Sequence, residues 1–114
     1  MEFLALIHAS DDGWNELSDE ERQAVYKRYM EFSDRPEVVG GAELQETNTA
    51  TTVRVRDGDS VVTDGPYAEV KEALGGFFIL EADSIDDACK LAAEIPAAER
   101  GAVEVRPVYV REES

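Results

Sequence analysis

The chain of 114 residues is poor in the residues that build disulfides and metal centres, with one cysteine, Cys89, and one histidine, His8. A lone cysteine excludes an internal disulfide and any cluster of several thiolates. The carboxylates are scattered without the spacing of a calcium loop, so we expect no bound metal and no cofactor. Cys89 falls on the apolar face of an expected helix, where it is interpreted as a packing residue.

Basic residues and long apolar runs are also scarce. The 11 Lys and Arg are outnumbered by 26 Asp and Glu, which gives a formal net charge of -15. Such an acidic chain repels the phosphates of nucleic acids and of anionic membranes, so we expect neither as a partner. No run is long enough to span a bilayer, and the start Met1-Glu2-Phe3 lacks the basic residues of a signal peptide, which predicts a cytoplasmic protein. Solubility and salt adaptation both explain the acidity.

No repeat or linker divides the sequence, so we expect residues 1–114 to form a single domain. The expected strands cover residues 2–8, 38–44, 77–80 and 103–110. Two of them, 2–8 and 77–80, are apolar at both parities, which is typical of strands covered on both faces. Pro107 lies inside the last strand, which indicates a bulge or a sheet edge.

Two helices and a hairpin complete the expected elements. Ser18 and Glu21 form a capping box, which predicts a helix that runs to about Ser33. Ser84 begins a weaker box before a second helix, which Pro96 closes. Alternating segments on either side of an Asp-Gly pair at residues 57–58 predict a hairpin, because both turn positions need a positive φ.

The element order is β-α-β, a hairpin, then β-α-β. It predicts an α+β fold, the ferredoxin-like split βαβ arrangement with an extra β-hairpin. Two helices can cover only one face of such a sheet, whereas two of its strands are apolar on both faces. We therefore expect a homodimer in which a second subunit packs sheet against sheet.

Residues 63–78 read Thr-Asp-Gly-Pro-Tyr-Ala-Glu-Val-Lys-Glu-Ala-Leu-Gly-Gly-Phe-Phe. This segment resembles the signature of the DGPF branch of YCII-related proteins, T-D-G-P-F-x-E-x-K-E-x-L-G-G-[FY], with Tyr67 at the usual phenylalanine. Residues 41–44 and 50–54 upstream, and 95–96 and 103–108 downstream, are also similar to the family, so the resemblance covers nearly the whole chain. It implies a dimeric α+β barrel.

The resemblance implies less about activity. Most DGPF members have no assigned reaction, and many are similar to proteins encoded beside extracytoplasmic-function sigma factors, which implies a stress-response setting. The broader YCII group includes a dehydrochlorinase in which a histidine on the first helix and an aspartate near the sheet are the proposed acid–base pair. The expected first helix, residues 18–33, contains no histidine, so that pair does not transfer to this chain.

His8 and Asp64 are the candidate catalytic residues. An imidazole titrates close to cytoplasmic pH, and Asp11 or Asp12 is placed to orient His8 as a general base. A strand-end histidine bonded to a backbone carbonyl is the structural alternative. Asp64 lies in an Asp-Gly-Pro turn, where its carboxylate either caps the turn or faces a ligand at the mouth of a barrel.

Tyr67, Glu69, Lys71 and Arg54 are the candidate ligand-binding residues. Glu69 and Lys71 share one side of an extended loop, where they grip a polar ligand or form an exposed ion pair. Arg54 points the same way as Arg56, so the two either hold a carboxylate or form salt bridges with neighbouring acids.

Two functions are consistent with these residues. One is an accessory protein that binds a small ligand or a protein partner in a sigma-factor-linked stress response, which the missing helix histidine favours. The other is a lyase or isomerase that acts on a small acidic or enolisable compound, with Asp64 as the base. The polar loop around Asp64 keeps this second function open.

Overall fold

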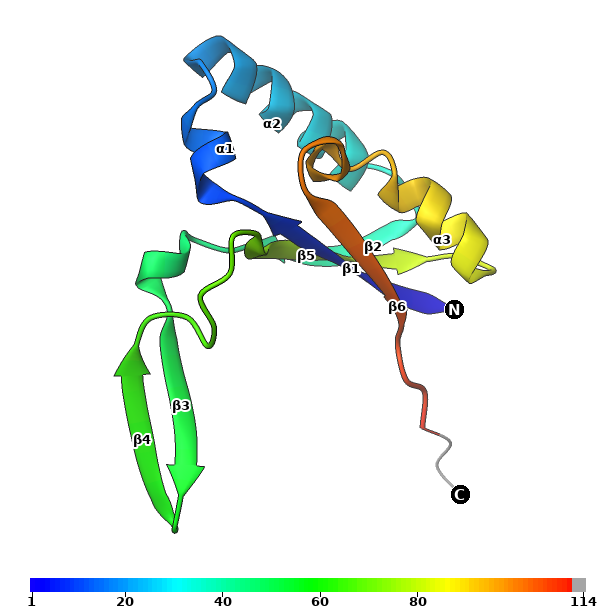
Figure 1. Cartoon of the computed structure of the whole chain (residues 1–114). Helices are drawn as coiled ribbons and strands as arrows, with labels where there is room; N and C mark the ends of the chain where they lie inside the picture. The colour runs from blue at the N-terminus through cyan, green and yellow to red at the C-terminus, as the bar shows by residue number, and fades with distance from the viewer. Residues whose placement is uncertain (112–114) are drawn as a thin grey trace.

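The computed structural model describes residues 1–111 and contains a four-stranded antiparallel sheet (Figure 1). Its strands are β1 (Glu2–Ala9), β2 (Val38–Glu43), β5 (Ala73–Glu81) and β6 (Ala102–Pro107). They lie in the order β2-β5-β1-β6, so the first strand pairs with the two strands of the second half. This topology confirms the expected ferredoxin-like α+β fold.

Two longer helices cover one face of the sheet, α2 (Asp19–Ser33) and α3 (Ile85–Ala92). The capping box that predicted α2 is present, since Ser18 Oγ accepts from the Glu21 N–H at 3.1 Å and Glu21 Oε1 accepts from the Ser18 N–H at 3.0 Å. At the start of α3, Ser84 Oγ accepts from the Asp87 N–H at 3.1 Å. Both helix starts are therefore determined by local sequence.

The core lies between these helices and the sheet. Phe3, Ala5 and Ile7 alternate along β1 and are buried. Ala5 and Ile7 belong to one core cluster with Leu80 of β5 and Phe32 of α2. Because successive side chains of a strand point to opposite faces of the sheet, every second side chain of β1 faces this core and the others face the opposite side.

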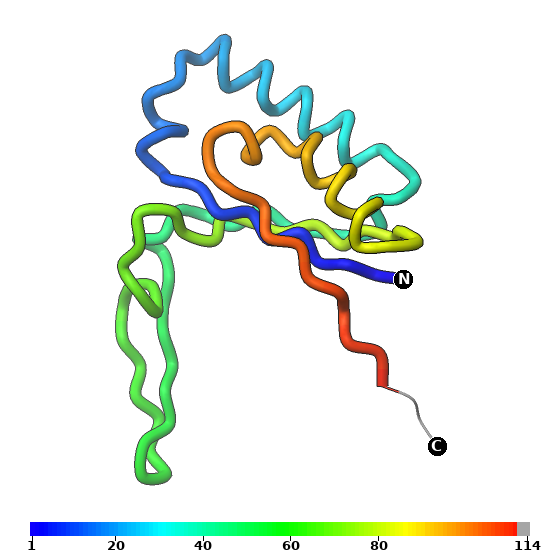
Figure 2. Tube along the Cα trace, turned by 45° about the vertical axis from the view of Figure 1, so that its right-hand side comes forward, coloured from blue at the N-terminus to red at the C-terminus, as the bar shows by residue number. Residues whose placement is uncertain are grey.

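The opposite face of the sheet carries the other apolar set. Leu4 pairs with Ile79 and Leu6 pairs with Phe77, so the four side chains lie together, each half-buried. Figures 1 and 2 show the helices on the other side of the sheet. We call the surface of Leu4, Leu6, Phe77 and Ile79 the open face.

The predicted hairpin is a separate two-stranded sheet of β3 (Thr51–Arg56) and β4 (Asp59–Asp64). Asp57 and Gly58 have φ values of 52° and 82°, which confirms the turn that the Asp-Gly pair predicted. The hairpin projects away from the main sheet, on the side opposite the helices (Figure 2). The radius of gyration is accordingly 16.4 Å, whereas a compact domain of this length has about 13 Å.

Several features differ from the expectation. A short helix, α1 (Asp11–Asn15), follows β1, and 3-10 helices occur at η1 (Thr47–Thr49) and η2 (Pro96–Glu99). The last strand ends at Pro107 rather than at 110, and it is an edge strand, as the proline indicated. Cys89 is exposed rather than packed, because Ala88, Leu91 and Ala92 form the buried side of α3. Within residues 1–111, no helix is both long enough and apolar enough to cross a membrane.

Two glycines give a matched test of this packing. At Gly101 an added Cβ would lie 2.2 Å from the His8 carbonyl oxygen, whereas at Gly13 in α1 it would meet nothing within 4 Å. We expect Gly101→Ala to lower the free energy of unfolding by about 1–3 kcal/mol, because β6 must move away from β1. Gly13→Ala should be neutral or slightly stabilising. Urea denaturation measures both, and equal stability of the two variants would contradict the pairing of β1 with β6.

Candidate functional site

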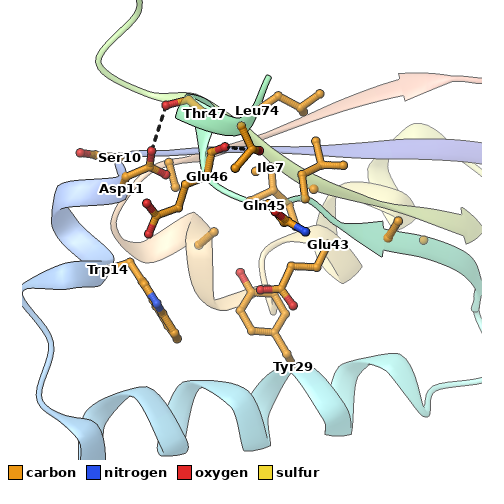
Figure 3. A pocket seen from close by; sticks show the side chains of 18 of the residues that line it. Ile7, Ser10, Asp11, Trp14, Tyr29, Glu43, Gln45, Glu46, Thr47 and Leu74 are labelled. Carbon is orange, nitrogen blue, oxygen red and sulfur yellow. Dashed lines mark hydrogen bonds between the residues drawn. The ribbon is translucent and has the colours of Figure 1, made fainter. Parts of the chain in front are cut away.

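A cavity of about 750 Å³ lies between α2 and the sheet, where β1 leads into α1 (Figure 3). Its apolar wall includes Ile7, Leu74 and Phe78. Trp14, Tyr26 and Tyr29 add aromatic rings from the helical side. A space of this size and lining is suited to a small organic molecule.

Local contacts fix Trp14 as one wall of the cavity. Its ring meets the Tyr26 ring edge-to-face, with centroids 5.2 Å apart and planes at 74°. Arg22 Nε donates to the Trp14 carbonyl oxygen at 3.3 Å, and the Arg22 guanidinium lies 6.0 Å from the ring centroid. Leu17 is buried just after α1. The turn from α1 into α2 therefore positions the indole.

Three carboxyl groups line the same cavity, and each comes from a different segment. Asp11 belongs to α1, Glu43 ends β2, and Glu46 precedes η1. Asp11 Oδ2 accepts from Thr47 Oγ1 at 3.1 Å, which joins α1 to the loop after β2. Among the described residues that line the cavity, none is Lys, Arg or His.

Tyr29 rises from α2 toward Glu43 inside the cavity (Figure 3). Burial raises the pKa of the Tyr29 hydroxyl, and the negative charge of Glu43 acts in the same direction. Since an ordinary tyrosine already titrates well above neutrality, the phenol of Tyr29 keeps its proton at neutral pH. Its ring stacks on Phe78, with centroids 6.3 Å apart and planes at 23°, and its O–H is a polar group in the cavity wall.

The residues that the sequence indicated do not line this cavity. They are His8, Asp64, Tyr67, Glu69, Lys71 and Arg54. His8 lies on the parity of β1 that faces away from α2. Its Nε2 is 3.1 Å from Glu104 Oε1, while Glu104 Oε2 accepts from Arg106 Nε at 2.8 Å. The expectation that Asp11 or Asp12 orients His8 is therefore wrong, because the pairing of β1 with β6 supplies Glu104 instead.

Asp64 is the last residue of β4 and pairs with Thr51. Over residues 1–111, its carboxylate takes part in no hydrogen bond or ion pair. The turn is held by Gly65, which has a φ of 108°, donates its N–H to the Ala50 carbonyl at 2.7 Å and accepts from Thr52 Oγ1 at 2.8 Å. The Asp64 side chain is exposed and does not cap the turn.

Of the remaining candidates, the structure brings together only Arg54 and Tyr67. The Arg54 guanidinium lies 5.5 Å from the Tyr67 ring centroid, a cation–π contact on the outside of the hairpin. Tyr67 is 81% exposed. Glu69 and Lys71 are both exposed, and within the described part of the chain they form no ion pair with each other. These residues form no enclosed site within one protomer.

Little in the sequence indicates the cavity. The sequence predicts Asp11 only as a partner for His8, and no pattern marks Glu43 or Glu46 as a site residue. The available signal was Trp14, the one tryptophan of the chain, in a segment for which no helix or strand was expected. A large aromatic residue outside the expected elements must pack against something that periodicity does not indicate.

The contact among His8, Glu104 and Arg106 predicts a pH effect. Hydrogen bonds from Arg106, and secondarily from His8, hold the pKa of Glu104 below its ordinary value. A carboxyl whose pKa is lowered by folding stabilises the protein above its unfolded pKa, and this contribution is lost as the pH falls through the folded pKa. In a carboxyl NMR titration we expect Arg106→Gln to raise the Glu104 pKa more than His8→Gln does. An unchanged pKa in Arg106→Gln would contradict the contact.

Comparison with known proteins places the chain in a family. The family model described as the YCII-related domain matches residues 1–112. An uncharacterized protein of Rhizobium meliloti is 36% identical over 101 residues, which cover 83% of this chain and 79% of that protein. The chain belongs to the YCII-related domain family.

Proposed function

We propose that this protein binds a small organic ligand in the cavity beside α2 and works as a homodimer. The observation that carries the proposal is the cavity itself, about 750 Å³ between the helix and the sheet, with aromatic and carboxyl groups in its wall. A few convergent polar groups in a mostly apolar cavity are typical of ligand sites. The cavity therefore supports the hypothesis that the chain is an accessory protein that binds a small ligand. The sigma-factor-linked stress response is what the DGPF resemblance implies for its setting.

The lyase or isomerase alternative has less support from the geometry. It needs Asp64 as a base with Tyr67, Glu69 or Lys71 beside the same substrate. In one protomer these side chains are exposed along the segment from β4 to β5, and they do not line the cavity. Moreover, an acidic substrate would find no basic residue among the described residues of the cavity wall. Binding is therefore the better-supported function.

The homodimer is supported by the open face and by the hairpin. Leu4, Leu6, Phe77 and Ile79 form a contiguous apolar surface that the helices of the same protomer do not reach. The hairpin projects on this side of the sheet and carries further apolar residues; Val53, Val55 and Val62 are each more than 60% exposed. Two copies that face each other would bury both surfaces, each hairpin lying along the partner. The extended shape of one protomer then becomes part of a compact pair.

The ligand site can be tested through Trp14, because it is the one tryptophan of the chain and lies in the cavity wall. We expect compounds that raise the melting temperature in a metabolite screen to change the Trp14 emission as well. A ligand at a hundred times its Kd adds about 2.7 kcal/mol of stability. Stabilising compounds that leave the Trp14 emission unchanged, or a screen without any stabilising compound, would contradict the proposed site.

A filled cavity provides the control for that screen. Gly75 lines the cavity, and a Cβ added there meets nothing within 4 Å, as is also true of Gly13 outside the cavity. Gly75→Leu should therefore occupy ligand space and weaken binding at least about tenfold, since roughly 1.4 kcal/mol corresponds to that factor. Gly13→Leu should bind like the parent. If both variants bind the ligand equally well, the ligand does not bind in this cavity.

The dimer is tested by placing a charge on the open face. The parent should run at twice the protomer mass of 12.6 kDa in light scattering at micromolar concentration. Leu6→Glu should give monomers, because a carboxylate buried between two sheets is costly. Met30→Glu adds the same charge at a position on α2 that is 68% exposed, so it should stay dimeric. A monomeric parent, or a dimeric Leu6→Glu, would overturn this interface.

A further inference from the structure

We infer that the ligand of this cavity is an organic cation, an ammonium- or amidine-bearing molecule with an apolar body. The inference rests on the proposed function, since it specifies the chemistry of the ligand in the same cavity. Charge, aromatic geometry and the spacing of the acidic groups each support it.

The charge of the wall favours a positive ligand. Asp11, Glu43 and Glu46 bring three carboxyl groups into the cavity from three segments, and no described lining residue carries a positive charge. Figure 3 shows Glu43 beside the Tyr29 ring and Asp11 bonded to Thr47, with Glu46 near Asp11. Asp11 is half-buried and Glu43 and Glu46 are exposed, so their charges repel a carboxylate or phosphate ligand with the moderate strength of charges near a protein surface. A cation gains the same interaction with the opposite sign.

The aromatic residues favour a cation for a separate reason. The face of an indole or phenol ring attracts a positive group within about 6 Å of its centroid, and tryptophan attracts it most. Trp14 already does this within the chain, since the Arg22 guanidinium lies 6.0 Å from its centroid. Tyr29 and Tyr26 line the same cavity. Aromatic faces beside carboxylates are the combination that recognises substituted ammonium groups.

The arrangement fits an organic cation better than a metal ion. Among residues 1–111, no group of three or more His, Cys, Asp or Glu is placed to hold a metal. The three carboxyl groups of the cavity are thus spread around the space rather than converging on one point. Ile7, Leu74 and Phe78 occupy another part of the wall. An extended molecule with an apolar body and a charged end satisfies both parts, which a small inorganic ion cannot do.

Three probes of similar size and different charge test this inference: benzyltrimethylammonium, benzyl alcohol and benzoate. Their affinities are measured by Trp14 fluorescence and by calorimetry on the full chain at physiological salt. We expect benzyltrimethylammonium to bind at least about tenfold more tightly than benzyl alcohol. The reason is that only the ammonium compound gains both the attraction of the carboxylates and the cation–π contacts. Benzoate should bind more weakly than the alcohol.

A matched pair of double variants separates the cavity from the general acidity of the chain. Glu43→Gln with Glu46→Gln removes two charges from the wall, and Glu20→Gln with Glu72→Gln removes two exposed charges elsewhere. We expect the first pair to lose about tenfold in benzyltrimethylammonium affinity and to keep its benzyl alcohol affinity. The second pair should behave like the parent. An equal loss in both pairs would show general attraction to an acidic protein and would overturn the inference.

The remaining outcomes distinguish this inference from the proposed function. Benzoate or benzyl alcohol binding as tightly as benzyltrimethylammonium, with Trp14 reporting, would overturn the cation and leave a ligand site in the cavity. If none of the three probes binds, the charge of the compounds found in the metabolite screen shows whether the ligand is a cation. Cationic compounds that lose affinity in Glu43→Gln with Glu46→Gln support the inference, and neutral or anionic compounds overturn it. If no compound in the screen changes the Trp14 emission, both the proposed function and this inference are contradicted.

Discussion

The structure depends on one constraint: the two central strands are apolar on both faces, whereas the two helices cover one face. Phe3, Ala5 and Ile7 of β1 are buried, whereas Leu4 and Leu6 of the same strand are half-buried. Burial of apolar surface is the dominant favourable term in folding and association. The fold of one protomer therefore leaves an apolar surface that the second subunit would cover in the proposed dimer, and the hairpin projects on this side of the sheet.

The same alternation separates the two chemical features of the chain. Ile7 faces the helices and lines the cavity, whereas the next residue, His8, belongs to the other parity and meets Glu104. Adjacent residues of one strand thus serve different surfaces. In the proposed dimer, the contact between His8 and Glu104 lies toward the second subunit, and the ligand cavity stays on the helical side. Ligand binding and dimer formation can then occur without competing for residues.

Local signals in the sequence predicted most of the fold. The capping box at Ser18 and the Asp-Gly turn at residues 57–58 each act over a few residues, and both are confirmed. The strands expected at 2–8 and 77–80 are also present, whereas cover on their second face stays a prediction. The cavity was not predicted, because Trp14, Glu43 and Glu46 meet only through the approach of α1 to α2 and to the end of β2. The five residues of α1 are too few to show a helical period. Asp64 was favoured for its place in a turn, but the backbone of Gly65 holds that turn.

In the proposed dimer, the open face of the sheet is buried against a second copy of the chain. Isotope-filtered NMR on a mixture of labelled and unlabelled chains tests it directly, because it records only contacts between subunits. We expect intermolecular contacts from Leu4, Leu6, Phe77 and Ile79, and none from Phe3 or Leu80, which are buried in the core of one protomer. Intermolecular contacts confined to the helices, or no such contacts at concentrations where the protein is dimeric, would contradict it.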